Sequence, residues 1–437
     1  MNRADTVICA EYLLTMNSGL DVIQNGAVAV QGSTIAAVGP ADAIMNEFSS
    51  DKVIDCRGKV LMPGFVNTHT HASMVFFRGL ADDMPLKEWL ENHIWPAEAK
   101  WLSPEFVCDA AELACMEMIM AGVTLFNDMY FYVDSVAMAA KKMGMRAVIG
   151  NGILDFPTKT GKSPEDYLKT AEEFAKKYKN DDLISSCLAP HSSYTCSSET
   201  LKKVCKTAEK LDLFVCTHLS ETEWEISEIV SRYGSRPVQH LDNAGLLNER
   251  LIAAHCVWLD EAEIDLMSKR GVNVSHCIES NLKLASGIAP VPAMLKAGVK
   301  VSLGTDGAAS NNDLSIMGEM ATAAKVHKAV AKDPTVLDAK TALLMATRWG
   351  AEALGLGSVA GSIEPGKRAD IITISLNKPH FMPVYDICSH IVYAAQASDV
   401  QDVMINGELL LRNRELVHAS EEDILAKAQE WGSRITG

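Results

Sequence analysis

His69 and His71 are the first residues along the chain whose types and spacing could do chemistry. They follow the apolar run Val60, Leu61 and Met62 and lie two residues apart. If this run is a β-strand, both side chains point to the same side, because strand side chains alternate. Two imidazoles on one side can bind one metal ion. The same short pattern also fits one histidine packed in the core and one in solvent, so its interpretation depends on residues elsewhere.

Polar residues that suit metal binding or proton transfer recur at the ends of later apolar runs. In chain order they are Asp128, Asn151, His191, His218, Glu221, His255, His276 and Asp306. A single histidine in such a position would most often pack in the core or cap a helix. Because polar residues of these types follow nearly every apolar run, we infer that they form a shared site. Imidazole and carboxylate ligands without thiolates suit zinc or ferrous iron. We therefore predict a metal site made of His69, His71, His218 and Asp306.

Three of these residues are also candidates for catalysis. A cation in the predicted site would lower the pKa of a bound water and so generate a nucleophile near neutral pH. Glu221 comes three residues after His218 and is placed to pass a proton to the substrate. His255 and Asp306 are placed to orient and deprotonate the water. For Glu221 the alternative is a first-turn acid that interacts with the N-terminus of the next helix.

The elements that must position these residues are short apolar runs that alternate with helical patterns. The runs cover residues 60–66, 123–126, 147–150, 184–188, 213–216, 251–254, 272–274 and 299–303. Helical patterns that open on capping or first-turn residues cover residues 103–121, 164–179, 197–211 and 260–269. Eight strands, each followed by a helix, over roughly 250 residues predict an α/β fold, a (β/α)8 TIM barrel with its active site where the strands end.

The two ends of the chain carry β-strand patterns of another kind. Short runs cover residues 6–10, 26–30, 34–38 and 52–55, and similar runs cover residues 369–374, 400–405 and 408–411. A sheet made only of the four N-terminal runs would be too small to form a stable domain by itself. We predict a small β-sandwich domain built from both chain ends, with residues 1–60 and 366–437 flanking a barrel of residues 61–365. A closing amphipathic helix is expected at residues 420–435.

Composition excludes several classes of function. The chain has 437 residues, of which 48% are hydrophobic and 22% charged, and a formal net charge of −16, which disfavours nucleic-acid binding. Its eleven cysteines are irregularly spaced and form no Cys-x-x-Cys pair, so neither a disulfide framework nor a thiolate zinc site is indicated. The first residues lack a signal-peptide pattern, and no long uncharged apolar stretch follows. We expect a cytoplasmic protein that does not bind membranes.

Five segments together resemble the amidohydrolase superfamily, in particular its 5-methylthioadenosine/S-adenosylhomocysteine deaminases. They are PGFVNTHTH at 63–71, LAPHS at 188–192, HLSE at 218–221, AAHC at 253–256 and SLGTDGAASNN at 302–312. The resemblance implies the four metal ligands given above, a glutamate at Glu221 that protonates a ring nitrogen, and a histidine at His255 that steers the attacking water. Binuclear relatives carry a bridging lysine at the end of strand four, and residues 183–191 contain none. One divalent ion is therefore implied, Zn²⁺ in preference to Fe²⁺.

The resemblance also implies how the substrate is bound. The segment at residues 89–98 resembles the family's loop after strand one, whose glutamate, at the place of Glu98, binds the ribose hydroxyls. The alternative for Glu98 is an exposed helical acid. His191 is expected to contact the nucleoside, and Trp89 and Trp95 either form the pocket wall or pack in the core.

Two departures from the family concern the far end of the substrate. Asn151, an expected substrate contact, stands where members that use S-adenosylhomocysteine carry an arginine for the amino-acid carboxylate. Lys162 is a possible substitute. The segment from Ser275 to Asn281 also differs, because many relatives have Asn-Pro directly after the histidine.

The predicted function is metal-dependent hydrolytic deamination of adenosine-type nucleosides. The candidate substrates are 5'-methylthioadenosine, 5'-deoxyadenosine, adenosine and S-adenosylhomocysteine. Two alternatives remain at this stage: the same chemistry on guanine, cytosine, a pterin or a triazine, and a scaffold that has kept the barrel without catalysis. The resemblance further implies a homo-oligomer, a dimer or a tetramer.

Overall fold

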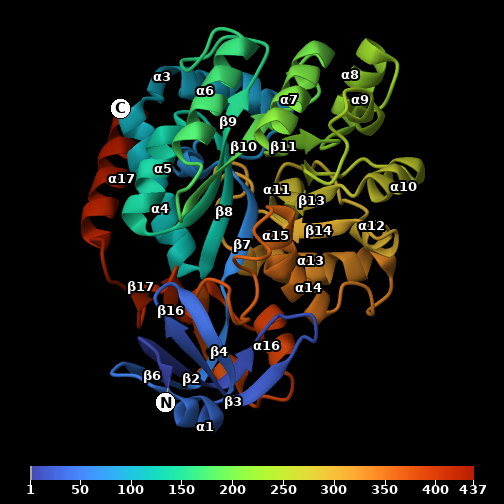
Figure 1. The fold of residues 1–437 in the computed structure, drawn as a ribbon. Helices are drawn as coiled ribbons and strands as arrows, with labels where there is room; N and C mark the ends of the chain where they lie inside the picture. The colour runs from blue at the N-terminus through green and yellow to red at the C-terminus, as the bar shows by residue number, and fades with distance from the viewer. Residues whose placement is uncertain (1) are drawn as a thin grey trace.

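A computed structural model describes residues 2–437, and a parallel eight-stranded barrel forms its larger part (Figure 1). The sheet order is β14-β13-β12-β11-β10-β9-β8-β7. These strands are β7 (Phe65–Thr70), β8 (Val123–Tyr130), β9 (Arg146–Ile153), β10 (Ile184–Pro190), β11 (Phe214–Leu219), β12 (Leu251–His255), β13 (Asn273–His276) and β14 (Lys300–Leu303). Between the first and last strands, Asp306 N–H donates to the His69 carbonyl at 3.0 Å and Thr68 Oγ1 donates to the Leu303 carbonyl at 2.8 Å. The predicted barrel is confirmed.

Helices surround the barrel, and several begin at the predicted capping residues. They are α4 (Pro104–Met120), α5 (Val133–Met143), α6 (Pro164–Lys177), α7 (Ser198–Leu211), α8 (Glu223–Tyr233), α9 (Pro237–Asn243), α10 (Glu261–Arg270), α11 (Ile278–Lys283), α12 (Val291–Lys296), α13 (Ile316–Ala331), α14 (Ala339–Ala346) and α15 (Arg348–Ala353). Ser103, Ser197 and Asp260 each accept the backbone N–H three residues on, as helix N-caps do. Ala351 and Leu354 pack against Val66, Leu125 and other side chains inside the barrel, so α15 closes its N-terminal end.

Both chain ends combine in a second, mixed sheet below the barrel, as expected (Figure 1). Its order is β18 (Glu415–Leu416), β17 (Glu408–Arg412), β16 (Val400–Ile405), β15 (Ile371–Ser375), β6 (Val53–Pro63), β2 (Thr6–Leu14), β3 (Val22–Gln31) and β4 (Thr34–Pro40). One continuous sheet encloses its own apolar core, in which Ile8, Val28, Leu61, Ile371 and Met404 pack together. The division at residues 60/61 and 365/366 stays a prediction.

The remaining elements lie at the edges of these two units. A short parallel pair, β1 (Asn2–Arg3) and β5 (Phe48–Ser49), and helix α1 (Ala41–Glu47) belong to the chain's first part. Helices α16 (Ile387–Tyr393) and α17 (Glu421–Thr436) belong to its last part, and α17 begins after its N-cap Ser420 and runs beside α4 (Figure 1). No helix in residues 2–437 is long and apolar enough to cross a bilayer.

The first predicted barrel strand differs from the observed one. Residues 60–66 were expected to form one strand, but β6 ends at Pro63 in the mixed sheet and β7 begins at Phe65 in the barrel. Gly64 separates them, and a Cβ at this position would lie 2.1 Å from the Thr124 side chain. The chain therefore passes between the two sheets at a residue where only glycine fits.

A helical segment after β7 covers the C-terminal end of the barrel. It contains a 3-10 turn (Ala72–Phe77), α2 (Leu86–Trp89), a π-helical turn (Leu90–Ile94) and α3 (Trp95–Trp101). Its inner side chains, including Trp89, Trp95 and Glu98, line a cavity at this end of the barrel.

Candidate active site

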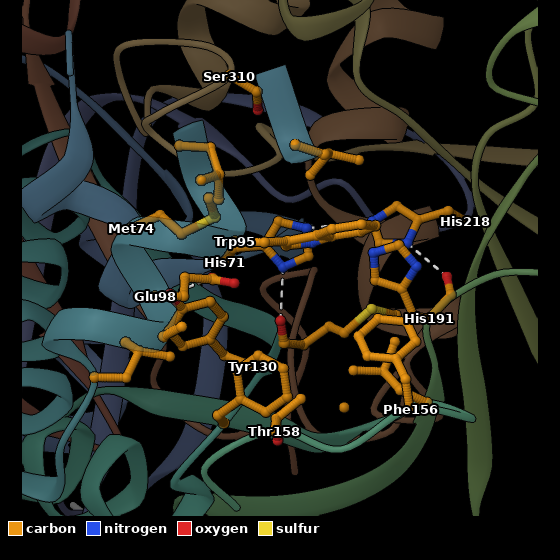
Figure 2. Close-up of a pocket in the computed structure, with 18 of the residues that line it drawn as sticks. His71, Met74, Trp95, Glu98, Tyr130, Phe156, Thr158, His191, His218 and Ser310 are labelled. Atoms are coloured by element: carbon orange, nitrogen blue, oxygen red, sulfur yellow. Dashed lines mark hydrogen bonds between the residues drawn. The ribbon is translucent and has the colours of Figure 1, made fainter. Parts of the chain in front are cut away.

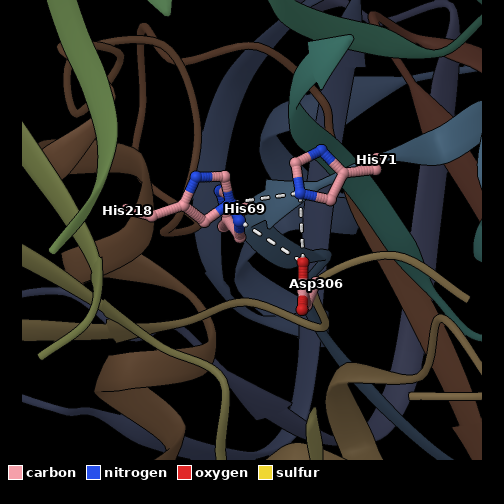
Figure 3. Close-up of side chains that lie close together, drawn as sticks. All are labelled: His69, His71, His218 and Asp306. Atoms are coloured by element: carbon pink, nitrogen blue, oxygen red, sulfur yellow. Dashed lines mark hydrogen bonds and ion pairs between the residues drawn. The ribbon is translucent and has the colours of Figure 1, made fainter. Parts of the chain in front are cut away.

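Four side chains from distant parts of the barrel converge on one point (Figure 3). One ligand atom from each of His69, His71, His218 and Asp306 lies within 4.8 Å of all the others. His71 Nε2 is 3.2 Å from both His218 Nε2 and Asp306 Oδ1, and His69 Nε2 is 3.5 Å from Asp306 Oδ1. Donors around a tetrahedral zinc ion, with bonds of about 2.0–2.1 Å, lie about 3.3 Å apart. The cluster therefore has the spacing of a metal site.

Neighbouring groups hold these ligands in the form that binds a cation. His71 Nδ1 donates to the Met129 carbonyl and His218 Nδ1 to the His191 carbonyl, both at 2.6 Å, which leaves each Nε2 lone pair free. His69 Nε2 is buried without a hydrogen-bond partner. A buried polar atom without a partner is rare, and a metal ion would satisfy this nitrogen.

Asp306 lies at the end of β14, where two hydroxyl groups fix its carboxylate. Ser280 and Ser310 each donate to Oδ2 at 2.7 Å, so Oδ1 remains for the histidines. The backbone of Asp306 has a φ of 62°, and that of His255 a φ of 70°. These left-handed conformations are unfavourable for residues other than glycine and are often found at functional sites.

Glu221 and His255 lie beside the metal cluster, where the sequence analysis placed the proton-transferring groups. His255 Nε2 is 3.9 Å from Glu221 Oε2, and His255 Nδ1 lies 2.8 Å from Asn281 Oδ1, which fixes its ring. Both side chains are buried. Burial raises the pKa of the Glu221 carboxyl above its ordinary value, so the group keeps a proton at higher pH than a solvent-exposed glutamate.

The cluster borders a cavity of about 460 Å³, which is lined by His71, His218 and Asp306; Figure 2 shows the two histidines. Glu98, from α3, lines the cavity and accepts a hydrogen bond from the Tyr130 hydroxyl at 2.7 Å. Burial raises the pKa of Glu98 to about 7, although the hydrogen bond from Tyr130 and the charge of His71 oppose this. His191 lines the same cavity, and burial followed by the charges of His71 and His69 lowers its pKa to about 3. His191 is thus a neutral ring at physiological pH.

The structure separates Asn151 from the other candidates. It is not among the lining residues, whereas its neighbour Gly152 is. The Asn151 amide donates to the Tyr167 carbonyl of α6 at 3.2 Å, on the outer face of β9. Likewise His276 turns away from the cavity, and its Nε2 lies 2.9 Å from His327 Nε2 on α13.

Sequence reasoning missed several lining residues. The cavity is lined by Lys159 rather than Lys162, and the Lys159 ammonium donates to the carbonyls of Lys100 and Leu102 at 3.0 and 2.9 Å. Tyr130 and Phe156 were also missed. Tyr130 follows Asp128 by two residues at the end of a strand, which is a signal that could have found it; the loop that carries Phe156 and Lys159 has no such pattern.

Comparison with known proteins gives the family. The family model described as "Amidohydrolase family" matches residues 60–410. The chain belongs to the amidohydrolase family. The resemblance drawn from the sequence is therefore confirmed, and so is the single metal site at the strand ends of this amidohydrolase.

Individual relatives are similar over nearly their whole length. A 5-methylthioadenosine/S-adenosylhomocysteine deaminase from Thermodesulfovibrio yellowstonii is 54% identical, over 98% of each chain. A 5'-deoxyadenosine deaminase from Methanothermobacter thermautotrophicus is 46% identical, over 95% of this chain and 96% of its own. The crystal structure of an adenosine deaminase from Xanthomonas campestris with bound zinc has a TM-score of 0.98 and 43% identity, over 100% and 99% of the two chains.

Proposed function

We propose that this amidohydrolase hydrolytically deaminates adenosine-type nucleosides to the inosine-type product and ammonia. The observation that carries the proposal is a single cavity with two kinds of polar group. The metal ligands and Glu221 lie at one part of its wall, and Glu98 with Tyr130 lies at another. The deaminases to which the chain is 46–54% identical are named for such nucleosides.

His69, His71, His218 and Asp306 would hold one divalent ion, and their donor set suits Zn²⁺ as well as Fe²⁺. A bound cation of this kind supplies Lewis acidity, which lowers the pKa of a water ligand toward neutrality. The bound zinc in the Xanthomonas campestris structure supports Zn²⁺ as the ion.

The chain's own residues then do the proton transfers. His255 and Asp306 orient the attacking water and take up its proton. Glu221 donates a proton to the ring nitrogen next to the amino-bearing carbon, so that this carbon becomes a better electrophile. The water oxygen adds to the carbon. The proton taken up by His255 or Asp306 then passes to the amino group, which leaves as ammonia, and the added hydroxyl returns a proton to Glu221, so that the carbonyl form of the ring remains.

Glu98 and His191 select the sugar. An ionised Glu98 accepts hydrogen bonds from the vicinal ribose hydroxyls, and the neutral His191 ring contacts the nucleoside beside it. A free base such as guanine has no diol for Glu98, so this carboxylate favours nucleosides over bare heterocycles. Among the described residues that line the cavity, Lys159 is the one lysine or arginine, and backbone carbonyls already engage it. We therefore expect 5'-methylthioadenosine and 5'-deoxyadenosine to be better substrates than S-adenosylhomocysteine.

Ammonia release from zinc-loaded protein tests the proposal. The panel contains 5'-methylthioadenosine, 5'-deoxyadenosine, adenosine and S-adenosylhomocysteine, with guanine as the free-base comparison. Glu221→Gln should lower kcat at least about 100-fold while zinc remains bound, because proton transfer typically contributes 10²–10⁴-fold. No ammonia from any nucleoside contradicts the proposed substrate class, and guanine turnover with an unaffected Glu98→Ala variant favours a heterocycle aminohydrolase.

The expected homo-oligomer also stays a proposal. Sedimentation velocity distinguishes a dimer or tetramer from a monomer of 47.4 kDa.

A further inference from the structure

Glu225 is a buried carboxylate that the proposed chemistry does not use. It lies in the first turn of α8, only 1% of its surface is exposed, and the Thr222 hydroxyl accepts its backbone N–H. Both carboxylate oxygens are engaged. Oε2 accepts the backbone N–H of Glu221 at 2.8 Å, and Oε1 accepts the Ser193 hydroxyl at 3.1 Å.

The first of these bonds fixes the peptide unit directly before the proposed proton donor. The Ser220 carbonyl and the Glu221 N–H belong to the same planar peptide group. That carbonyl accepts the N–H groups of Val257 and Trp258 at 3.0 and 2.8 Å, while Glu225 accepts the N–H on the other side. Three hydrogen bonds therefore determine the orientation of this plane, and with it the direction in which the Glu221 side chain leaves the backbone.

The plane needs such support because Ser220 is strained. Its φ is 51°, a left-handed conformation that costs a non-glycine residue roughly 1–3 kcal/mol. Without the Glu225 carboxylate, the Glu221 N–H would be buried without an acceptor, and relaxation of Ser220 would rotate the plane.

The second bond connects Glu225 to the neighbouring strand end. Ser193 follows His191 by two residues, and the His191 carbonyl accepts both the backbone N–H of His218 at 3.0 Å and its ring Nδ1–H at 2.6 Å (Figure 2). One carboxylate thus links the loop after β10, which carries His191, to the loop after β11, which carries Glu221.

The surroundings of Glu225 are unfavourable for a charged carboxylate. Within residues 2–437, no lysine or arginine forms an ion pair with it, and burial raises its pKa to about 7. An acid buried without a cationic partner is unfavourable for folding compared with a well-packed apolar residue. Its hydrogen bonds go instead to two loops that line the active-site cavity.

We propose that Glu225 is a positioning residue, which fixes the Ser220–Glu221 peptide and the His191 loop so that the Glu221 carboxyl faces the substrate ring. This inference rests on the proposed function. Glu225 itself touches neither substrate nor metal ligand.

Three single variants test the inference in zinc-loaded protein with 5'-methylthioadenosine. Glu225→Ala should lower kcat about 10–100-fold, because a displaced catalytic group loses orientation, with KM changed less than about threefold and zinc content unchanged. Glu225→Gln should recover kcat to within about fivefold of the wild type, since its amide oxygen can accept from Glu221 N–H and its amide nitrogen can donate to Ser193 Oγ. Glu223→Ala, which changes an exposed acid on the same turn, should stay within about twofold.

A double variant separates positioning from a general effect on the fold. If Glu225 acts through Glu221, Glu225→Ala should lower kcat less than about threefold further in a Glu221→Gln background. A full additive loss, loss of zinc in Glu225→Ala, or an unchanged kcat in Glu225→Ala would each overturn the inference.

Hydrogen exchange tests the positioning role of Glu225 independently of the proposed function. The backbone amides of residues 218–225 should exchange faster in Glu225→Ala than in the wild type, whatever the substrate. Unchanged exchange contradicts the positioning role even if the wild type is inactive, whereas an inactive wild type with faster exchange in the variant contradicts only the substrate class.

Discussion

At the scale of single residues, Glu98 shows how burial adapts a carboxylate to its task. An ordinary glutamate would stay ionised down to a pH near 4.5, but burial raises the pKa of Glu98 to about 7. Only the ionised form can accept hydrogen bonds at both oxygens, because protonation turns one oxygen into a donor. Ribose binding through Glu98 should therefore depend on pH within the physiological range.

The sign of this dependence follows from the direction of the shift. Because the pKa is raised, the binding form of Glu98 is lost as the pH falls below about 7, by up to about tenfold per pH unit. We expect KM for 5'-methylthioadenosine to rise between pH 8 and pH 5.5 in the wild type. In Glu98→Gln, which does not titrate, KM should be higher at pH 8 and nearly constant across the range. A wild-type KM that is flat with pH contradicts this role of Glu98.

His69 is the metal ligand whose binding nitrogen has no other partner, which makes it a sharp test of the site. His69→Ala removes one of four ligands, and we expect zinc content to fall from near one equivalent to below about 0.2 after dialysis, because the ion loses one of its four protein donors. His93→Ala removes an exposed histidine and should leave zinc content unchanged. Elemental analysis of both proteins makes the comparison, and retention of a full equivalent by His69→Ala would contradict the assignment.

At the scale of elements, the passage from β6 to β7 depends on Gly64. Its N–H donates to the Asp370 carbonyl at 3.1 Å, and the Thr124 side chain fills the space where a Cβ would be. Gly64→Ala must displace either the β8 backbone that carries Thr124 or the strand that carries His69 and His71. We expect a loss of at least about 3 kcal/mol in the free energy of unfolding, more than overpacking at an adaptable site.

Urea unfolding followed by circular dichroism measures this loss. Gly366→Ala offers a matched control for a change of glycine to alanine, because no atom lies within 4 Å of a Cβ there; its φ of 91° adds only backbone strain. A Gly64→Ala protein as stable as that control would show that Thr124 can move aside.

The same passage shows how far the sequence predicts the elements. Apolar runs and capping residues gave the barrel, the mixed sheet and the starts of several helices, because these signals are local. The run at residues 60–66 reads as one strand, since apolar periodicity does not distinguish two strands in different sheets. For the site, histidines at strand ends predicted the metal cluster. The sequence did not determine which face of a strand each residue occupies: Asn151 lies on the outer face of β9, one residue from Gly152, which lines the cavity.

At the scale of the whole molecule, a buried ion pair joins the barrel to the mixed sheet. Arg146 begins β9, and its Nε and Nη2 donate to the two carboxylate oxygens of Asp370, just before β15, at 2.7 and 3.2 Å. Both side chains are at most 4% exposed, and Asp370 also accepts the Asn406 N–H at 2.7 Å. The pair lies at the opposite end of β9 from the cavity, so it concerns the assembly of the two units rather than the chemistry.

Removing one partner of this ion pair should therefore lower the stability of the protein without changing its catalytic activity. Asp370→Asn leaves a buried guanidinium without its counter-charge, and such a change typically costs about 3–5 kcal/mol, whereas Asp51→Asn at the exposed Arg3–Asp51 pair should cost less than about 0.5 kcal/mol. The urea midpoint should fall sharply only for Asp370→Asn, while ammonia release from 5'-methylthioadenosine at 25 °C stays within about twofold of the wild type. If Asp370→Asn instead lost activity at unchanged stability, the junction would be coupled to the active site through β9, because this strand runs from Arg146 to the cavity wall at Gly152.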